Sequence, residues 1–492
     1  MSEQTRYDKV VDLALRRGLF YPSSELHGAI AGFYDYGSVG SRIKNNWENC
    51  WRGFFLRRLG EPFVEIQPAE VAPEKVFEAS GHLTQFVDPI TECGKCGAVE
   101  RADHLLESHL KEGFEGLSAK GLGALIKKHK VKCHKCGGDL KEVSVLNMML
   151  STRIGTGKLS KPAYMRPETT QGVVVNFKRE YLINRERLPL GIAVIGRAFR
   201  NEIAPRQTLF RMREFTQAEI QVFCDPSELA KHARFSEVAT SKIPVVLAKE
   251  RKKGIQMVSA KALAKEYGEV YAYYMARISE FYASPGLRVR FFEKNEEERA
   301  FYNKYQFDIE YEFEDGGWRE IAGFHYRTDH DLAGHARVSG QDLSVNRNGK
   351  RVIPHIVELS FGVDRNLLAL LDAGYREEKK KDEMRVWLSL PPAVAPFTAG
   401  VYPLVNKDRL PEKTEEVLQL LRNAGLDVFL DDGGSIGRRY ARADEIGVPF
   451  GITIDYDTFK DDSVTVRERD STKQERVKIK VLAEHLKNKL NK

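Results

Sequence analysis

Four cysteines in two CxxC pairs carry the most specific chemical signal in the sequence. Cys93 and Cys96 form the first pair, and Cys133 and Cys136 form the second. Four thiolates presented by two tight turns suit tetrahedral zinc, and four protein ligands leave no open position for water. A redox motif or two unrelated exposed pairs are the alternatives. The spacing therefore predicts a structural Zn²⁺ site within residues 92–143.

A second group of side chains falls on residues 195–202 and 213–223, which we expect to form two strands joined by a long loop. Because side chains alternate between the faces of a strand, one face packs in the core and the other is polar. On the second strand Phe215, Gln217 and Glu219 share a face. Arginine neutralises phosphate and an aromatic ring stacks on a purine, so this face could bind a nucleoside triphosphate; a solvated salt-bridge ladder is the alternative. The residues that carry the nucleotide prediction are Arg200, Glu202, Arg211, Phe215 and Gln217.

Residues 355–361 read as a further strand, followed by a glycine turn and an apolar helix. Alternation puts Glu358 and Ser360 on one face of this strand and Leu359 on the other, in the core. Arg365 falls in the first turn of the helix, where an anion is preferred. A phosphate bound nearby would account for this arginine, and a structural salt bridge is the alternative.

Several domains must position these segments. A chain of 492 residues exceeds the ~250 to 300 residues that one hydrophobic core usually serves. Its 42% hydrophobic and 30% charged residues predict packed cores and argue against a disordered or fibrous protein. A net charge of +7 permits an anionic partner without requiring one. No apolar run is long enough for a membrane span and no export signal is apparent. We therefore expect a cytoplasmic protein that does not associate with a membrane.

Composition and pattern divide the chain. A run of charged residues predicts a linker before a C-terminal α/β domain of alternating strands and helices. Upstream, strands with long connections predict a mainly antiparallel sheet. Two insertions interrupt it: a zinc-binding insertion and a helical or mixed insertion. The expected divisions are 1–91, 92–143 (zinc-binding), 144–225, 226–315 (helical or mixed), 316–374, 375–384 (charged linker) and 385–492.

Two of these segments resemble signature motifs of the class II aminoacyl-tRNA synthetases. Phe199 to Glu202 is similar to the FRxE of motif 2, with Arg211 to Phe215 as its RxxxF, and Gly362 to Arg365 resembles the GxDR of motif 3. Motif 1 would correspond to residues 43–68, with Pro73 as the alternative to Pro68 for its proline. The resemblance implies an α+β fold, in which a mainly antiparallel catalytic sheet flanked by helices is followed by a C-terminal α/β anticodon-binding domain.

Within this class the chain is similar to the dimeric glycyl-tRNA synthetases of archaea and eukaryotes, over nearly its whole length outside the insertions. The blocks that carry this likeness are 32–37, 79–82, 166–172, 199–219, 318–320, 327–329 and 435–447. The last block resembles the anticodon-binding domain of the glycyl, prolyl, threonyl and histidyl enzymes, in its glycyl form. Ser38 and Leu359 stand where the family usually has proline, and neither replacement removes a chemical group.

The resemblance implies a homodimer that uses ATP to activate glycine as glycyl-adenylate. The glycyl group then passes to the 3′-hydroxyl of the terminal adenosine of glycine tRNA. By the family roles, Arg200 holds the α-phosphate and the glycine carboxylate, and Phe215 stacks on adenine. Arg211 and Arg365 hold the γ-phosphate. Mg²⁺ bridges phosphates, with Glu358 as a candidate ligand, and the implied catalytic residues are Arg200, Glu202 and Arg365.

The residues implied around glycine are Glu168, Glu358, Ser360, Glu320 and Arg327. A positive ammonium group requires carboxylates, although Glu168 could instead serve a helix dipole and Ser360 a turn. In the C-terminal domain the candidate RNA contacts are Arg438, Arg439 and Arg442, for which a solvated helix face is the alternative.

Two other functions compete with this one. A class II enzyme for proline or threonine is disfavoured by the glycyl form of residues 166–172. A non-catalytic RNA-binding paralogue should have lost Arg200, Phe215 or Arg365, and the sequence retains all three.

Overall fold

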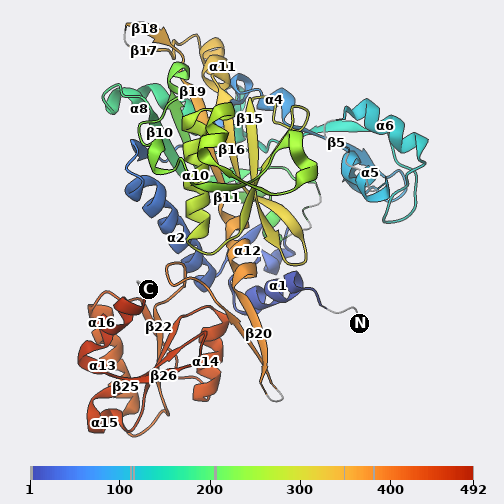
Figure 1. Cartoon of the computed structure of the whole chain (residues 1–492). Coiled ribbons are helices and arrows are strands. Elements are labelled where there is room, and N and C mark those ends of the chain that lie inside the picture. Colours follow the sequence, from blue (N-terminus) through green and yellow to red (C-terminus); the bar gives the residue numbers. More distant parts are fainter. Residues whose placement is uncertain are drawn as a thin grey trace.

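The computed structural model describes residues 4–110, 114, 117–203, 205, 208–347, 349–380 and 383–490. Figure 1 shows a large body built on one sheet, a smaller C-terminal domain, and a projection to one side that carries α5 and α6. In the described ranges, no helix is both long enough and apolar enough to cross a membrane.

A nine-stranded sheet forms the large body, in the order β13-β12-β14-β15-β16-β19-β11-β10-β3. Neighbouring strands are antiparallel except for the pairs β12–β14 and β10–β3, so the prediction of a mainly antiparallel sheet is confirmed. The strands are β3 (Phe63–Glu65), β10 (Leu190–Phe199), β11 (Glu214–Cys224), β12 (Lys242–Val246), β13 (Gln256–Ser259), β14 (Val289–Glu293), β15 (Tyr305–Phe313), β16 (Gly317–Thr328) and β19 (His355–Gly362).

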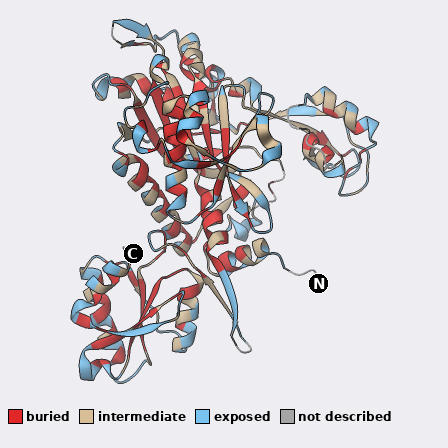
Figure 2. Ribbon diagram, in the orientation of Figure 1, coloured by how far each residue is buried: buried red, intermediate tan, exposed pale blue. Residues whose placement is uncertain are grey.

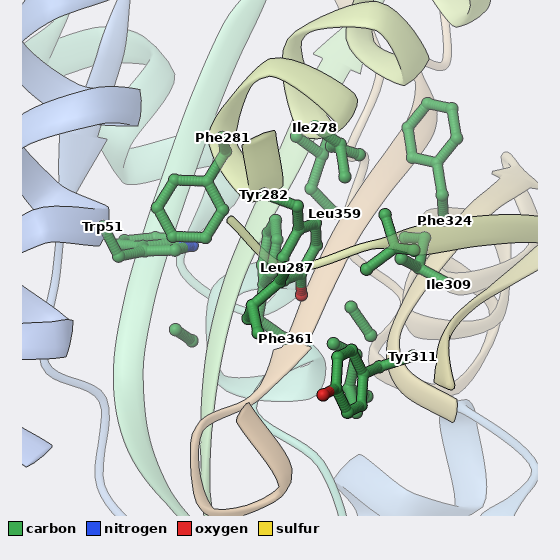
Figure 3. Close-up of a cluster of buried hydrophobic side chains, with 14 of the residues drawn as sticks. Trp51, Ile278, Phe281, Tyr282, Leu287, Ile309, Tyr311, Phe324, Leu359 and Phe361 are labelled. Carbon is green, nitrogen blue, oxygen red and sulfur yellow. The ribbon is translucent and has the colours of Figure 1, made fainter. Parts of the chain in front are cut away.

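One face of this sheet is apolar, because every second residue of its central strands is hydrophobic. On β19, Leu359 and Phe361 are fully buried, as the alternation predicts. The Phe361 ring lies 5.8 Å from that of Phe281 on α10 (Glu269–Ala283), and Trp51 at the end of α2 (Ser38–Trp51) lies 6.0 Å from it (Figure 3). α12 (Val363–Gly374) closes the core, since Leu367 and Leu371 recur at helical spacing. With this face packed, the opposite face is left for polar side chains.

Residues 226–315 do not form a body separate from the sheet. Strands β12 to β15 from this segment continue the central sheet beyond β16. The tyrosines that mark the segment in the sequence are core residues, since Tyr271, Tyr273 and Tyr282 are all buried on α10. Periodicity along the chain identifies such elements, but it does not reveal which sheet they join.

Residues 375–384 were expected as a charged linker. Those of them that the structure describes, 375–380 and 383–384, belong to an antiparallel hairpin of β20 (Tyr375–Lys380) and β21 (Glu383–Leu388). Tyr375 and Leu388 are buried where the hairpin meets the large body. The charged residues of β20 and β21 lie along a projecting two-stranded ribbon (Figure 2).

The C-terminal domain is a five-stranded sheet of order β23-β22-β24-β25-β26 with a hydrophobic core of its own. Strands β22, β23 and β24 run parallel and the others antiparallel, which confirms the predicted α/β pattern. Its elements are β22 (Ala399–Pro403), α13 (Leu410–Asn423), β23 (Val428–Leu430), α14 (Ile436–Glu445), β24 (Phe450–Ile454), α15 (Thr458–Asp461), β25 (Ser463–Glu468), β26 (Gln474–Lys478) and α16 (Ile479–Leu490).

The projection consists of a three-stranded sheet of order β6-β5-β7 and two helices. Its elements are β5 (Val87–Glu92), β6 (Val99–Arg101), α5 (Ala102–Leu110), α6 (Ala119–Lys128) and β7 (Ser144–Asn147). The helices bury a small cluster of apolar side chains that is separate from the main core. Further elements of the large body are α1 (Arg6–Arg16), β1 (Phe20–Pro22), β2 (Tyr34–Tyr36), β4 (Val71–Pro73), α3 (Glu74–Ala79), α4 (His82–Gln85), β8 (Ser151–Ile154), β9 (Lys161–Met165), α7 (Thr170–Val174), α8 (Phe177–Ile183), α11 (His330–Ser339), β17 (Val345–Arg347) and β18 (Lys350–Val352).

Candidate active site

The polar face of the central sheet collects side chains from three adjacent strands. The register pairs Glu219 of β11 with Ser360 of β19, and Gln221 with Glu358. On the other side of β19, His325 of β16 pairs with Glu358. Because paired residues project to the same side of a sheet, these five polar groups form one layer.

Arg327 holds a buried group of carboxylates together at this layer. Its side chain is 1% exposed, and Nη1 donates to Glu358 at 3.1 Å. Nη2 donates to Glu168 at 3.0 Å, and Nε donates to Asp331 at 2.8 Å. All three guanidinium nitrogens are thus engaged with carboxylates, and the Tyr302 ring lies 4.0 Å away over the guanidinium. Arg327 therefore fixes the orientation of Glu358 and Glu168, two of the residues predicted to bind glycine.

Glu358 and Glu168 are ionised in this arrangement. Burial opposes ionisation, but Arg327 and His325 lower the pKa of Glu358 to about 2. Burial also opposes ionisation of Glu168, whose pKa the charges of Arg327 and His82 hold well below its usual range. Two carboxylates thus carry negative charge inside the protein.

Glu219 lies between these carboxylates and was not predicted as a site residue. Its side chain accepts hydrogen bonds from Ser360 at 2.7 Å, from Thr170 at 3.1 Å and from Thr169. Burial, together with the charges of Glu358 and Glu168, raises its pKa to about 7. A buried cluster with more carboxylates than cations attracts a positive ligand, such as the ammonium group of an amino acid.

The predicted nucleotide residues meet in one pocket of about 250 Å³ beside this cluster. Ser360 and Gly323 also line it, so the pocket reaches the carboxylate layer. Members of its wall that the sequence predicted are Arg200, Glu202, Arg211, Phe215, Gln217, Glu320, Ser360 and Arg365.

Arg200 is preorganised by the elements around it. The sequence predicted that Arg200 and Glu202 lie on a strand that continues to residue 202. This is wrong, because β10 ends at Phe199 and both residues lie in the loop that follows it. The Arg200 guanidinium carbon lies 5.2 Å from the ring of Phe215 and 5.3 Å from that of Phe86, and Nε donates to the Pro167 carbonyl at 3.1 Å. Two aromatic contacts and one hydrogen bond hold this cation in place.

Two more arginines face the pocket, each beside a carboxylate. Arg365 donates to Glu320 at 2.9 Å, and Arg211 lies 3.5 Å from Glu202. The salt bridge considered for Arg365 is therefore present, within the pocket wall. Glu320, expected beside glycine, instead pairs with the arginine at the nucleotide side.

Asp364, which the sequence analysis did not select, ties the two motif segments together. One carboxylate oxygen accepts the backbone N–H of Thr216 at 2.6 Å, and the other accepts the hydroxyl of Tyr36. Thr216 follows Phe215, and Asp364 precedes Arg365. These bonds therefore set the distance between Phe215 and Arg365, which both line the pocket. Its position in the GxDR motif is the signal that could have identified it.

The four cysteines of the projection lie together. The Cys93 and Cys136 sulfurs are 3.5 Å apart, those of Cys96 and Cys133 are 3.7 Å apart, and all four lie within 4.8 Å of one another. A tetrahedron with Zn–S bonds of about 2.3 Å has edges of about 3.8 Å, so the group fits such an ion. The backbone N–H groups of Cys96 and Lys95 help lower the pKa of Cys93 to about 6, which favours the thiolate.

The three arginines of α14 differ in their surroundings. Arg438 is exposed. Arg439 is 2% exposed and donates to the carbonyls of Gly434 at 2.8 Å and of Asp432 at 2.6 Å. Arg442 pairs with Asp431 at 2.8 Å. Successive helical residues are rotated by about 100°, which is why neighbouring arginines do not share one face.

Comparison with known proteins decides the family. The family described as "tRNA synthetase class II core domain (G, H, P, S and T)" matches residues 158–243, and "Anticodon binding domain" matches residues 398–489. A glycine–tRNA ligase of Methanothrix thermoacetophila is 38% identical over 96% of this chain and 95% of its own length. The glycine–tRNA ligase of Methanocaldococcus jannaschii is 38% identical over 99% of this chain and 100% of its own length. That of Pyrococcus furiosus is 36% identical over 98% of each chain. The chain belongs to the glycine–tRNA ligase family.

The family assignment confirms the resemblance seen in the sequence and the class II α+β fold. A crystal structure of prolyl-tRNA synthetase from Cryptosporidium parvum, complexed with L-proline and AMP, has a similar fold. It matches with a TM-score of 0.58 over 99% of this chain and 78% of that one, at 14% identity. At that identity the likeness concerns the fold alone. The chain thus has the class II ligase core and the anticodon-binding domain of the glycine–tRNA ligases.

Proposed function

We propose that this protein is a glycine–tRNA ligase. It joins glycine to ATP as glycyl-adenylate with release of pyrophosphate, and then transfers the glycyl group to the 3′-hydroxyl of the terminal adenosine of glycine tRNA. One observation carries the proposal: a buried carboxylate cluster adjoins an arginine-lined pocket on the same sheet face. Ser360 joins the two, since it lines the pocket and donates to Glu219.

The carboxylate cluster supplies the site for the glycine ammonium group. Glu219 is the member whose pKa is raised to about 7, so its ionised form gains most from a positive ligand. Ser360 and Gly323 line the adjoining wall, and small residues there leave room for glycine at the sheet surface. An ammonium group held here directs the glycine carboxylate toward the nucleotide pocket.

The arginines of the pocket serve the first chemical step. A glycine carboxylate that approaches the α-phosphate meets another anion, so cations must offset the repulsion and stabilise the transition state. Arg200, held between two rings, is placed for the α-phosphate and the attacking carboxylate. Arg211 and Arg365 are placed for the γ-phosphate, and Phe215 for stacking on adenine.

Mg²⁺ would neutralise charge on the ATP phosphates. Glu202 fits it, because its carboxylate lines the pocket. Its buried Oε2 accepts no hydrogen bond from the described residues and is engaged by an ion-pair contact with Nε of Arg211 at 3.5 Å. Glu358, the candidate ligand from the sequence, is instead enclosed by Thr170, Gln221 and His325 at 2.7, 2.9 and 2.6 Å. We therefore propose that Glu202 and the ATP phosphates, and not Glu358, would bind Mg²⁺.

The other partners follow from the domains. Cys93, Cys96, Cys133 and Cys136 would hold the structural Zn²⁺. Exposed Arg438 is the arginine of α14 best placed for the anticodon arm of glycine tRNA, while Arg439 and Arg442 brace the preceding loop. From family membership we also infer a homodimer that acts in the cytoplasm, and sedimentation analysis tests the dimer.

Glycine-dependent ATP–pyrophosphate exchange tests the proposed activity. The expected result is exchange with glycine and not with alanine, serine or proline, followed by charging of glycine tRNA when the RNA is added. Exchange that prefers proline would assign another amino acid. Absence of exchange with every amino acid, together with retained tRNA binding, would favour a non-catalytic RNA-binding protein.

A further inference from the structure

A fourth arginine lines the nucleotide pocket and comes from outside the catalytic sheet. Arg101 ends β6 of the cysteine-bearing projection and lines the same pocket as Arg200, Glu202 and Arg211. Its side chain is 20% exposed. Neither the motif pattern nor the sheet alternation points to this residue, because it lies in an insertion far along the chain from both motifs.

Two carboxylates of the projection hold the Arg101 guanidinium in place. Nη1 donates to Asp88 of β5 at 3.1 Å. Nε and Nη2 donate to the two oxygens of Asp103 of α5 at 3.1 and 2.6 Å, in a paired geometry. Three hydrogen bonds to two elements fix the plane of this cation, and the cation in turn offsets part of the negative charge of two carboxylates beside the pocket.

The projection also contacts the loop that carries the nucleotide arginines. His104, which follows Asp103, places Nδ1 3.5 Å from Nη1 of Arg211. At the root of the projection, the backbone N–H of Asn201 donates to the Met148 carbonyl at 2.8 Å. Phe86, also at the root, covers Arg200. The projection therefore contacts this loop close to both Arg200 and Arg211.

We propose that Arg101 is a positioning residue for ATP in this enzyme. Its single positive charge balances one of the two negative charges of Asp88 and Asp103. It also fixes the part of the pocket wall that lies beside Arg211, so that the polyphosphate meets less negative charge. The inference rests on the proposed function, since it assigns part of the binding of ATP in glycine activation to the projection. Loss of Arg101 would leave two carboxylates facing an anionic ligand.

Kinetics of the full-length enzyme test this role. Arg101→Ala should raise the KM for ATP in glycine-dependent exchange by about tenfold or more, the usual scale of a charge-assisted contact. The KM for glycine should stay unchanged, whereas the thermal unfolding midpoint should fall, because buried Asp103 loses its paired cation. Arg101→Lys should fall between wild type and alanine, because it keeps the charge and loses the paired geometry. Lys141→Ala, which removes an exposed ion pair with Glu92 in the same projection, is the matched control.

A rescue variant separates charge from folding. Combining Arg101→Ala with Asp88→Asn and Asp103→Asn removes the uncompensated carboxylates and should recover most of the affinity for ATP. An unchanged KM for ATP in Arg101→Ala would overturn the proposal. So would a rise in both KM values together with a lower unfolding midpoint and no rescue, which would indicate a structural role. If wild type shows no glycine-dependent exchange, the proposed function fails instead, and calorimetric ATP binding by the same variants still decides the role of Arg101.

Discussion

Glu219 offers the sharpest test of the amino-acid site, because its ionisation links stability to ligand binding. Its pKa is about 7, against an ordinary value of 4.5. This difference corresponds to roughly 3 kcal/mol of folding free energy. The folded-state pKa is raised, so this stability is fully present below about pH 4.5 and is lost as pH rises through about 7. Above about pH 7 the ligand-free protein thus holds an unfavourable negative charge at Glu219, which an ammonium group would offset.

Glu219→Gln should therefore have opposite effects on stability and on glycine binding. The variant lacks the charge, so its stability relative to wild type should rise between about pH 5 and pH 8, by at most roughly 3 kcal/mol. Its KM for glycine should rise by about 10- to 100-fold, because a charge-assisted hydrogen bond contributes roughly 1.5–3 kcal/mol. The KM for ATP should change little, since Glu219 belongs to the carboxylate cluster and not to the pocket wall.

Two measurements decide this prediction. Denaturant unfolding at several pH values gives the stability difference, and exchange kinetics over the same range give the KM for glycine. In wild type that KM should fall as pH rises through about 7, and in Glu219→Gln this dependence should flatten. Glu312→Gln, at an exposed position on β15, is the control. A variant with wild-type glycine KM and the wild-type pH dependence would refute the reasoning.

Three further predictions concern separate parts of the molecule. Arg200→Ala should lower exchange by about 10²- to 10³-fold while the protein stays folded, and activity within about tenfold of wild type would contradict its role. Purified protein should contain about one zinc per chain, and Cys93→Ser should reduce that content; less than about a tenth of an equivalent in wild type would remove the site. Arg439→Ala should destabilise the C-terminal domain by about 3 kcal/mol, because the buried Pro403 carbonyl and the carbonyls of Asp432 and Gly434 lose their donor. Arg438→Ala should keep the wild-type unfolding midpoint and weaken tRNA binding in a filter-binding assay. If Arg438→Ala instead lowered the midpoint and Arg439→Ala weakened tRNA binding alone, the two assignments would be wrong.

Local patterns in the sequence were enough to predict several features. The two CxxC pairs indicated one four-cysteine group, because each pair forms within a single turn. Alternation along residues 355–361 placed Leu359 in the core and Glu358 and Ser360 on the polar face, because side chains alternate on any strand. The glycyl–tRNA synthetase resemblance rests on the same kind of short, local motif, and it located Arg200 and Arg365 in one pocket.

Residues that depend on contacts between distant segments were missed or misplaced. Glu219 was on the expected face, but only the register of β11 against β19 brings it to Ser360. Glu320 was expected near glycine, and strand β16 brings it to Arg365 instead. Arg439 looked equivalent to Arg438, until the fold of the preceding loop buried it.

The sequence by itself therefore determined the fold class, the family, the cysteine group and the face of each strand that carries polar residues. Only the tertiary structure decided which polar residues meet. Arg327 acts behind the carboxylates and Arg101 reaches the pocket from the projection because strand pairing and packing bring together residues far apart in the chain. Spacing along one segment follows from backbone geometry, whereas the pairing of distant segments follows from the burial of their apolar faces against a common core.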